Sequence, residues 1–211
     1  MRVRPWAPAL LVAALALLAG CKIVPIADHV AGNQKPDMGA QAAVLWEGQG
    51  RAFFSEAARP LPEVLAAIDG GLSTAGPLYG RRQNAEGAPW TFVVSGGGQI
   101  VEKNTASRAG TITLTLDGTS PPRDIVLQIG PVIRGNSVRD SLPFVSFEDF
   151  ENQLDYAEMG KALNALVLAA IADPAATAVA GGTANFIGVV SLTSPSDKIL
   201  VTPVVLEVGP S

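Results

Sequence analysis

The chain has 211 residues and a formal net charge of −4, and it is 48% hydrophobic but only 16% charged. This much apolar area can form a packed core, which excludes an intrinsically disordered chain. The acidic balance argues against a protein that binds nucleic acid through electrostatics. With one Cys and one His, the sequence allows neither an internal disulfide nor a zinc site built from Cys and His.

The first 21 residues have the pattern of an export signal that ends at a lipid attachment site. Arg2 and Arg4 precede an uncharged apolar stretch, residues 9–18, which is shorter than the about 20 residues that span a bilayer. The sequence Leu18-Ala19-Gly20-Cys21 resembles the lipobox of bacterial lipoproteins. The resemblance implies cleavage before Cys21 and a lipid on its thiol. That lipid would anchor the protein in the cell envelope, on the periplasmic side of the inner or the outer membrane.

We expect the chain to divide into four segments. Residues 1–20 form the signal peptide, and residues 21–38, which include the lone His29, form the lipid anchor and tether. Residues 39–120 are predicted to be an N-terminal β-rich unit. Residues 121–211 are predicted to be a C-terminal unit with a long helix and terminal strands.

The predicted elements begin with an ambiguous segment. Residues 39–58 carry apolar side chains, but Gly48 and Gly50 would weaken a helix by about 1 kcal/mol each. Residues 61–68 then place apolar side chains at i, i+3, i+4 and i+7, which predicts a short amphipathic helix. Gly70-Gly71 should end it.

Strands follow in the middle of the chain. Residues 90–94 and 99–102 are predicted strands, separated by a turn or bulge at Gly96-Gly97-Gly98. Residues 111–116 alternate cleanly between apolar and polar side chains, and residues 125–129 form another apolar run. Both predict strands.

The last third of the chain predicts one long helix and two strands. Ser146 should cap the helix, with Asp149 three residues later completing a capping box. Asp173-Pro174 should end it. Residues 185–192 and 199–208 are the predicted terminal strands.

These elements predict an α+β, strand-rich fold. Residues 61–116 and 147–208 share one order of elements: a helix, a turn that contains glycine, and two strands. We interpret this order as two small β-barrel-like (OB-like) units, each with an amphipathic helix.

The candidate site lies in the densest polar segment of the sequence, before and at the start of the long helix. Its arginines cannot be buried alone, so they must pair with acids or meet a ligand. In one interpretation they only fasten the loop to the helix; in the other, part of the network faces a groove and holds a polar solute. The network residues are Arg134, Arg139, Asp140, Asp149 and Asn152, with a second polar cluster at Asn104 and Arg108.

The sequence predicts no catalytic residues, no metal and no cofactor. His29 lies in the tether, so no Ser-His-Asp arrangement can be built. An enzyme that hydrolyses glycans with two carboxylates is the catalytic alternative, but the available acids crowd onto one helix start without an aromatic platform. Those acids are Asp140, Glu148, Asp149, Glu151 and Asp155.

Several blocks of the sequence resemble one bacterial family of unknown function, the predicted periplasmic lipoproteins. The resemblance rests on residues 90–94, 104–111, 128–135 and 139–153 and on the ending at 201–208. It implies a β-rich fold with barrel-like units and a role accessory to sugar import by ABC transporters. No catalytic residue can be carried over from it.

We therefore expect a non-catalytic envelope lipoprotein that binds a small polar solute or a component of an ABC transporter. A structural or assembly lipoprotein without a ligand is the alternative. The expected partners are the membrane, through lipidated Cys21, and that solute or transporter, but not nucleic acid.

Overall fold

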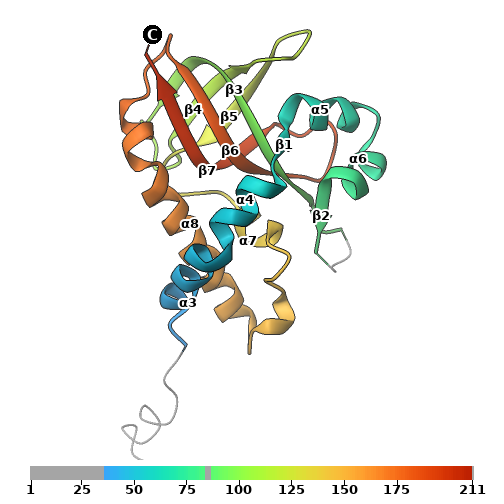
Figure 1. The fold of residues 1–211 in the computed structure, drawn as a ribbon, viewed down its shortest axis with the longest axis vertical. Helices are drawn as coiled ribbons and strands as arrows, with labels where there is room; N and C mark the ends of the chain where they lie inside the picture. The colour runs from blue at the N-terminus through green and yellow to red at the C-terminus, as the bar shows by residue number, and fades with distance from the viewer. Residues whose placement is uncertain (1–35, 84–86, 211) are drawn as a thin grey trace, which may run out of the picture. The chain divides into compact units, whose positions relative to one another are not determined.

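Five strands pair in a ring, which occupies the upper part of Figure 1. The computed structural model describes residues 36–83 and 87–210, so the signal peptide, His29 and Cys21 lie outside the described residues. The ring order is β3-β4-β5-β7-β6, and β6 pairs with β3 to close it. The β5–β7 pair is parallel and the others are antiparallel. The strands are β3 (Trp90–Asn104), β4 (Thr111–Leu116), β5 (Arg123–Gln128), β6 (Thr183–Leu192) and β7 (Leu200–Gly209).

Helices and two short strands surround this barrel. The strands β1 (Arg59–Pro60) and β2 (Gly80–Arg82) both pair with β3. The longest helix, α8, follows β5 and α7 and leads into β6. The helices are α3 (Met38–Leu45), the π-helix η1 (Trp46–Gly50), α4 (Arg51–Ala57), α5 (Leu61–Asp69), α6 (Leu72–Tyr79), α7 (Ser137–Ser141), the 3-10 helix η2 (Phe147–Asp149) and α8 (Gln153–Thr177).

The first hydrophobic core fills the barrel. β4 shows its pattern, because Ile112, Leu114 and Leu116 are buried while the threonines between them stay partly exposed. The apolar stripe of α5 and the buried residues of α6 pack into the same cluster, as does Ile171 near the C-terminal end of α8. The predicted helix at 61–68 is thereby confirmed, and so is the strand at 111–116.

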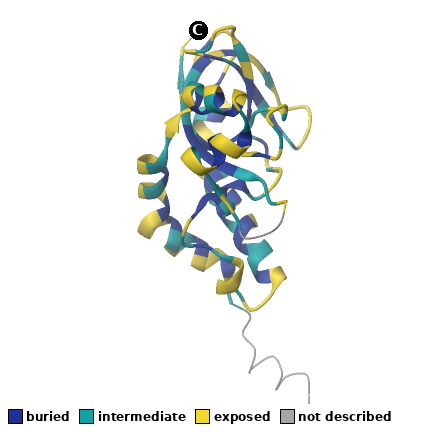
Figure 2. Cartoon of the chain, turned by 90° about the vertical axis from the view of Figure 1, so that its right-hand side faces the viewer, coloured by how far each residue is buried: buried dark blue, intermediate teal, exposed yellow. Residues whose placement is uncertain are grey.

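A second core lies on the outside of β3, β6 and β7. Val93, Val189 and Val204 point outward from these strands and belong to one cluster with residues of α3, α4, α7 and the N-terminal half of α8. Figure 2 shows that buried positions occur in helices as well as in strands. α8 contributes to both cores. Its residues Leu163 and Val167 belong to the second core, and Ile171 belongs to the first. By length and composition α8 could cross a bilayer, but its buried stripe is that of a core helix.

The two expected units are a single barrel. β3 from residues 39–120 pairs with β6 from residues 121–211 over ten residue pairs, and residues 37–211 form one compact unit. Neither half could close a ring alone, because β3 has neighbours from both halves. The expected fold class, α+β and strand-rich with an OB-like barrel, is confirmed.

The predicted turn at Gly96-Gly97-Gly98 is wrong, because β3 runs through it without a break. Here β3 pairs with β4 and β6 at once, so both neighbours approach closely. A Cβ atom at Gly96 would lie 2.9 Å from the ring of Phe186, and one at Gly98 would lie 2.0 Å from the Thr115 carbonyl oxygen. The glycines therefore allow the neighbouring strands to approach β3 closely. A bulge occurs later in β3, between Ile100 and Glu102.

The predicted limits of the long helix are also wrong. Ser146 and Asp149 do form a capping box, but on the three-residue helix η2. α8 itself starts at Gln153, where the Asn152 side chain accepts hydrogen bonds from two backbone N–H groups. The helix then continues past Pro174, because Ala175 packs in the barrel core and Lys103 Nζ donates to the carbonyl oxygens of its last turn.

The ambiguous segment at residues 39–58 is helical from Gly39 to Ala57, and Ala58 is extended. Its two glycines fall in the π-helical turn between α3 and α4. A Cβ at Gly50 would lie 3.3 Å from the Trp46 ring, which is buried in the second core. The wider turn and the missing side chain at Gly50 leave room for the large Trp46 side chain to pack inward.

Candidate functional site

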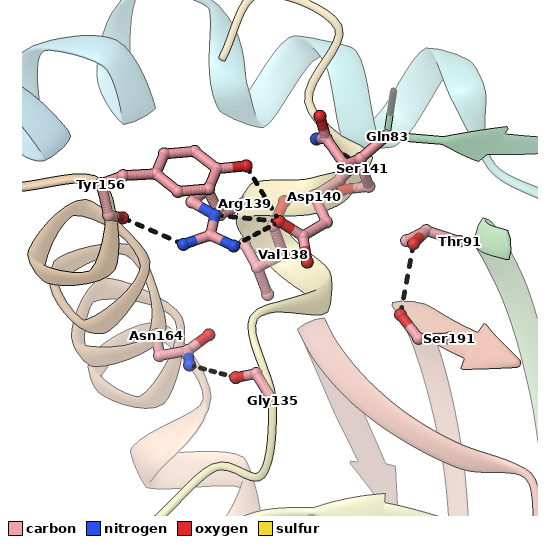
Figure 3. A network of polar contacts seen from close by, with 10 residues as sticks. All are labelled: Gln83, Thr91, Gly135, Val138, Arg139, Asp140, Ser141, Tyr156, Asn164 and Ser191. Carbon is pink, nitrogen blue, oxygen red and sulfur yellow. Dashed lines mark hydrogen bonds and ion pairs between the residues drawn. The ribbon is translucent and has the colours of Figure 1, made fainter. Parts of the chain in front are cut away.

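The candidate site is centred on Arg139 in α7, whose side chain is 9% exposed. Its Nε and Nη2 donate to Asp140 Oδ1 over 2.9 and 2.7 Å, and its Nη1 donates to the Tyr156 carbonyl oxygen over 3.0 Å. The guanidinium also lies 3.5 Å from the centre of the Tyr156 ring (Figure 3). An acid, a backbone carbonyl and an aromatic ring therefore compensate the buried charge.

This arrangement leaves one oxygen of Asp140 available. Among the described residues, the hydrogen bonds to this carboxylate all end on Oδ1, including a long one of 3.4 Å from the Tyr156 hydroxyl. The Asp140 side chain is 21% exposed. Oδ2 is thus an acceptor held in place by the buried Arg139 and open to a ligand.

Tyr156 remains protonated at neutral pH. The pKa of its hydroxyl is raised, mainly because the group is partly buried. Asp140 also raises this pKa, whereas Arg139 lowers it. The phenol therefore acts as a hydrogen-bond donor and as an aromatic surface.

A cavity of about 480 Å³ opens beside Arg139, Asp140 and Tyr156. Gln83, which follows β2, donates from Nε2 to the Asp140 carbonyl oxygen over 3.3 Å. Phe147 packs edge-on against Tyr156 with ring centres 5.5 Å apart and remains 51% exposed. The wall is thus both aromatic and polar. Its other residues are Ala88, Pro89, Thr91, Ser146, Glu148 and Gln153.

The loop before α7 is fastened to the barrel by buried polar groups. Gln128 Nε2 donates to the Thr202 hydroxyl over 2.9 Å, and Gln128 Oε1 accepts the Arg134 backbone N–H over 2.8 Å. Asn164 of α8 donates to the Gly135 carbonyl oxygen over 3.0 Å. Gly135 has a φ of +82°, a conformation that favours glycine. These bonds hold α7, and so Arg139, at a fixed place on α8.

Of the sequence-predicted residues, the structure brings together only Arg139 and Asp140. The Arg134 side chain is exposed, and only its backbone joins the network. Asp149 and Asn152 are close in sequence but cap η2 and α8.

Asn104 and Arg108 lie far from Arg139. Lys103, next to Asn104, contacts Ala176 and Ala178 at the C-terminal end of α8, whereas Arg139 contacts Tyr156 in its first turn. Ala176 lies twenty positions after Tyr156, which is a length of about 30 Å along the helix. The side chains of Asn104 and Arg108 are both exposed, so this second polar cluster is a separate surface.

Sequence reasoning missed Gln83, Thr91, Phe147 and Tyr156. Gln83 and Arg139 are 56 positions apart, and no local pattern links them. Phe147 and Tyr156 fall within the single long helix expected to start at Ser146, but a break separates η2 from α8 and both residues line the cavity.

A larger groove of about 810 Å³ lies along α3 and η1. Its lining is mostly apolar, with Val44, Leu45, Phe144 and Phe150 among its residues, and Asp149 lines one part. Within residues 36–83 and 87–210, no three His, Cys, Asp or Glu side chains gather as a metal site would require.

The fold defines an OB-fold barrel: five strands in the ring order first-second-third-fifth-fourth, with a helix between the third and fourth. An OB-fold protein of Thermotoga maritima of known crystal structure has the same fold, with a TM-score of 0.64 and 19% identity. The match covers 83% of this chain and 99% of that one. No curated protein matches the chain.

The chain belongs to the family described as predicted periplasmic lipoprotein (DUF2291), whose model matches residues 11–207. It is therefore a lipid-anchored protein of the cell envelope on the periplasmic side, as the sequence predicts.

Proposed function

We propose that this lipoprotein binds a small polar solute without chemical turnover, as an accessory to solute (sugar) transport. The binding site is the cavity of about 480 Å³ beside α7. The observation that carries the proposal is Asp140 Oδ2, an acceptor fixed by the buried Arg139 and placed next to two aromatic rings. Solute sites combine such fixed polar groups with apolar walls in cavities of about 300–1,000 Å³.

The lining favours a solute with hydroxyl groups. Asp140 Oδ2 and the side chains of Glu148 and Gln153 can accept hydrogen bonds from such a solute. The amide and hydroxyl side chains of the lining can also donate hydrogen bonds to it. Phe147 offers an exposed ring against which the apolar face of a sugar can pack.

A lipid on Cys21 would keep this site near the membrane. Asp37, the N-cap of α3, lies sixteen positions after Cys21, and a chain of this length reaches at most about 55 Å. The solute would thus be held within reach of a membrane transporter, for which the components of an ABC importer are the proposed partner.

The second candidate function is a structural or assembly lipoprotein without a ligand. The apolar groove along α3 and η1 favours it, because Val44 is 76% exposed there and an exposed apolar surface fits a protein partner. Under this alternative the Arg139–Asp140 pair only fastens α7 to α8.

Thermal-shift screening of the protein against sugars and polyols separates the two functions. A ligand at 100 times its Kd stabilises the folded state by about 2.7 kcal/mol, which raises the Tm by about 5–10 °C for a domain of this size. Phe147→Ala should weaken binding of such a hit about tenfold in calorimetry, because it removes an aromatic wall.

Leu154→Ala is the matched control, because Leu154 is also exposed, at 58%, but does not line the cavity. Equal loss of affinity in both variants would contradict the assignment of this cavity. A screen without any hit would favour the structural alternative.

A further inference from the structure

A second cavity adjoins the proposed site. It has a volume of about 360 Å³, lies between α4, β2, β3 and the end of α7, and shares Thr91 with the first cavity. Arg81 of β2 lines it and is paired in register with Thr91 of β3.

Arg81 is a half-buried cation without a counter-ion in the described part of the chain. Its Nε is inaccessible to solvent and has no hydrogen-bond partner within residues 36–83 and 87–210. None of the ion pairs among the described residues includes it; they join Arg51 to Glu47, Arg123 to Asp69 and Arg139 to Asp140.

The next residue shows how a satisfied arginine looks on the same strand. Arg82 Nε donates to the Ala88 carbonyl oxygen over 2.7 Å, and its guanidinium lies 5.8 Å from the centre of the Trp90 ring. A half-buried guanidinium without a counter-ion, as at Arg81, is costly unless a ligand supplies the acceptor. Because Nε is inaccessible, a ligand would bind the terminal nitrogens Nη1 and Nη2.

The rest of the cavity suits an anion. Among its described lining residues the polar ones besides Arg81 carry hydroxyls, namely Tyr79, Thr91 and Ser141, and no carboxylate is present. Glu63 of α5 raises the pKa of the Tyr79 hydroxyl, and among the described residues it forms no ion pair with Arg81. Oxyanions such as carboxylate and phosphate match the planar fork of donors on a guanidinium.

We propose that Arg81 is an anion-binding subsite, so that the solute carries a carboxylate or phosphate group at Arg81 while its hydroxylated part occupies the cavity beside Asp140. This inference rests on the proposed function and narrows its ligand to acidic solutes. It also places a ligand-binding arginine on β2, outside the polar segment that the sequence predicted as the site.

Binding of inorganic phosphate and of acetate tests the subsite directly. Each is titrated into the full-length protein in detergent, with sodium chloride at matched ionic strength as the reference, and Tm and calorimetric heat are measured. We expect saturable binding of at least one anion above the chloride reference, and a Kd that rises at least about tenfold in Arg81→Gln. The anion that binds tells whether the solute carries a phosphate or a carboxylate.

Arg82→Gln is the control, because it removes the same charge from the same strand, and it should leave the anion Kd within about twofold of the wild type. Arg81→Lys keeps the charge and should retain part of the affinity, which guards against a folding defect in Arg81→Gln. Equal weakening by Arg81→Gln and Arg82→Gln, or no saturable binding of either anion to the wild type, would overturn the subsite.

The two proposals can fail separately. Neutral sugars that bind with dependence on Phe147, without any effect of Arg81, would sustain the proposed function and refute the anion subsite. Anions that bind through Arg81, with no effect of Phe147→Ala on any hydroxylated ligand, would sustain the subsite and refute the proposed site.

Discussion

At the scale of single residues, the Arg139–Asp140 pair joins a structural role to the proposed binding role. Arg139 contacts the backbone of Tyr156 and stacks on its ring, so it connects α7 to α8. Asp140 neutralises it through one oxygen only. Arg139 thus has the role of the first sequence interpretation, which is to fasten the loop to the helix. Asp140, which lines the cavity, has the role proposed in the second.

Arg139→Ala should lower the free energy of unfolding by about 2–4 kcal/mol, because it leaves the partly buried Asp140 without its cation. The double variant Arg139→Ala/Asp140→Ala should lose less than the sum of the single variants, because neither charge then remains unpaired. Urea unfolding followed by circular dichroism measures these values.

Tyr156→Phe is the control for this pair. It keeps the ring under the guanidinium and removes only a long hydrogen bond, so its cost should stay below about 1 kcal/mol. A loss as large as that of Arg139→Ala would show that the hydroxyl, and not the ring, stabilises the arginine.

At the scale of elements, α8 is set by its caps and by the two cores. Asn152 caps its first turn and donates from Nδ2 to Asp155 Oδ2 over 2.8 Å. Asp155 is 3% exposed, and its Oδ1 has no partner among the described residues. Asn152 is therefore both the cap of the helix and the described donor to a buried carboxylate.

Asn152→Ala should destabilise the protein by about 2 kcal/mol, the upper end for a lost N-cap, because Asp155 also loses its donor. Ser146→Ala should cost less than about 1 kcal/mol, since Ser146 caps only the three-residue helix η2. Asn152→Ser keeps a capping oxygen and should fall between the two. The reverse order in urea unfolding would place the effective helix start at Ser146.

At the scale of the whole molecule, the chain combines a closed barrel with an anchor that the family description supports. The proposed cavity lies outside the barrel, between α7, η2, the start of α8 and the segment around β2. The segments α7, η2 and the start of α8 supply most of its lining, so removing them would leave the barrel without the site.

Cys21→Ser should abolish incorporation of an alkyne analogue of palmitate into the protein in living bacteria, because the thiol is the predicted attachment point. Lys22→Ser, at the next position, should leave the incorporation unchanged. Label in the Cys21→Ser protein, or none in the wild type, would contradict lipidation at Cys21.

The sequence by itself determined the features that depend on near neighbours. The periodicity of residues 61–68 predicted α5, the alternation of residues 111–116 predicted β4, and the lipobox pattern predicted the envelope location. The spacing of a few residues encodes each of these signals, so they can be read without the fold.

Only the tertiary structure decided what depends on distant partners. The glycines at 96–98 belong to an unbroken strand because β4 and β6 approach β3 together, and the helix start moves to Gln153 because Phe147 and Phe150 pack back on Tyr156. Likewise, Gln83 and Arg81 join the site only through the pairing of β2 with β3. Strand pairing and side-chain packing link residues far apart in the chain, and no local pattern records which partners they select.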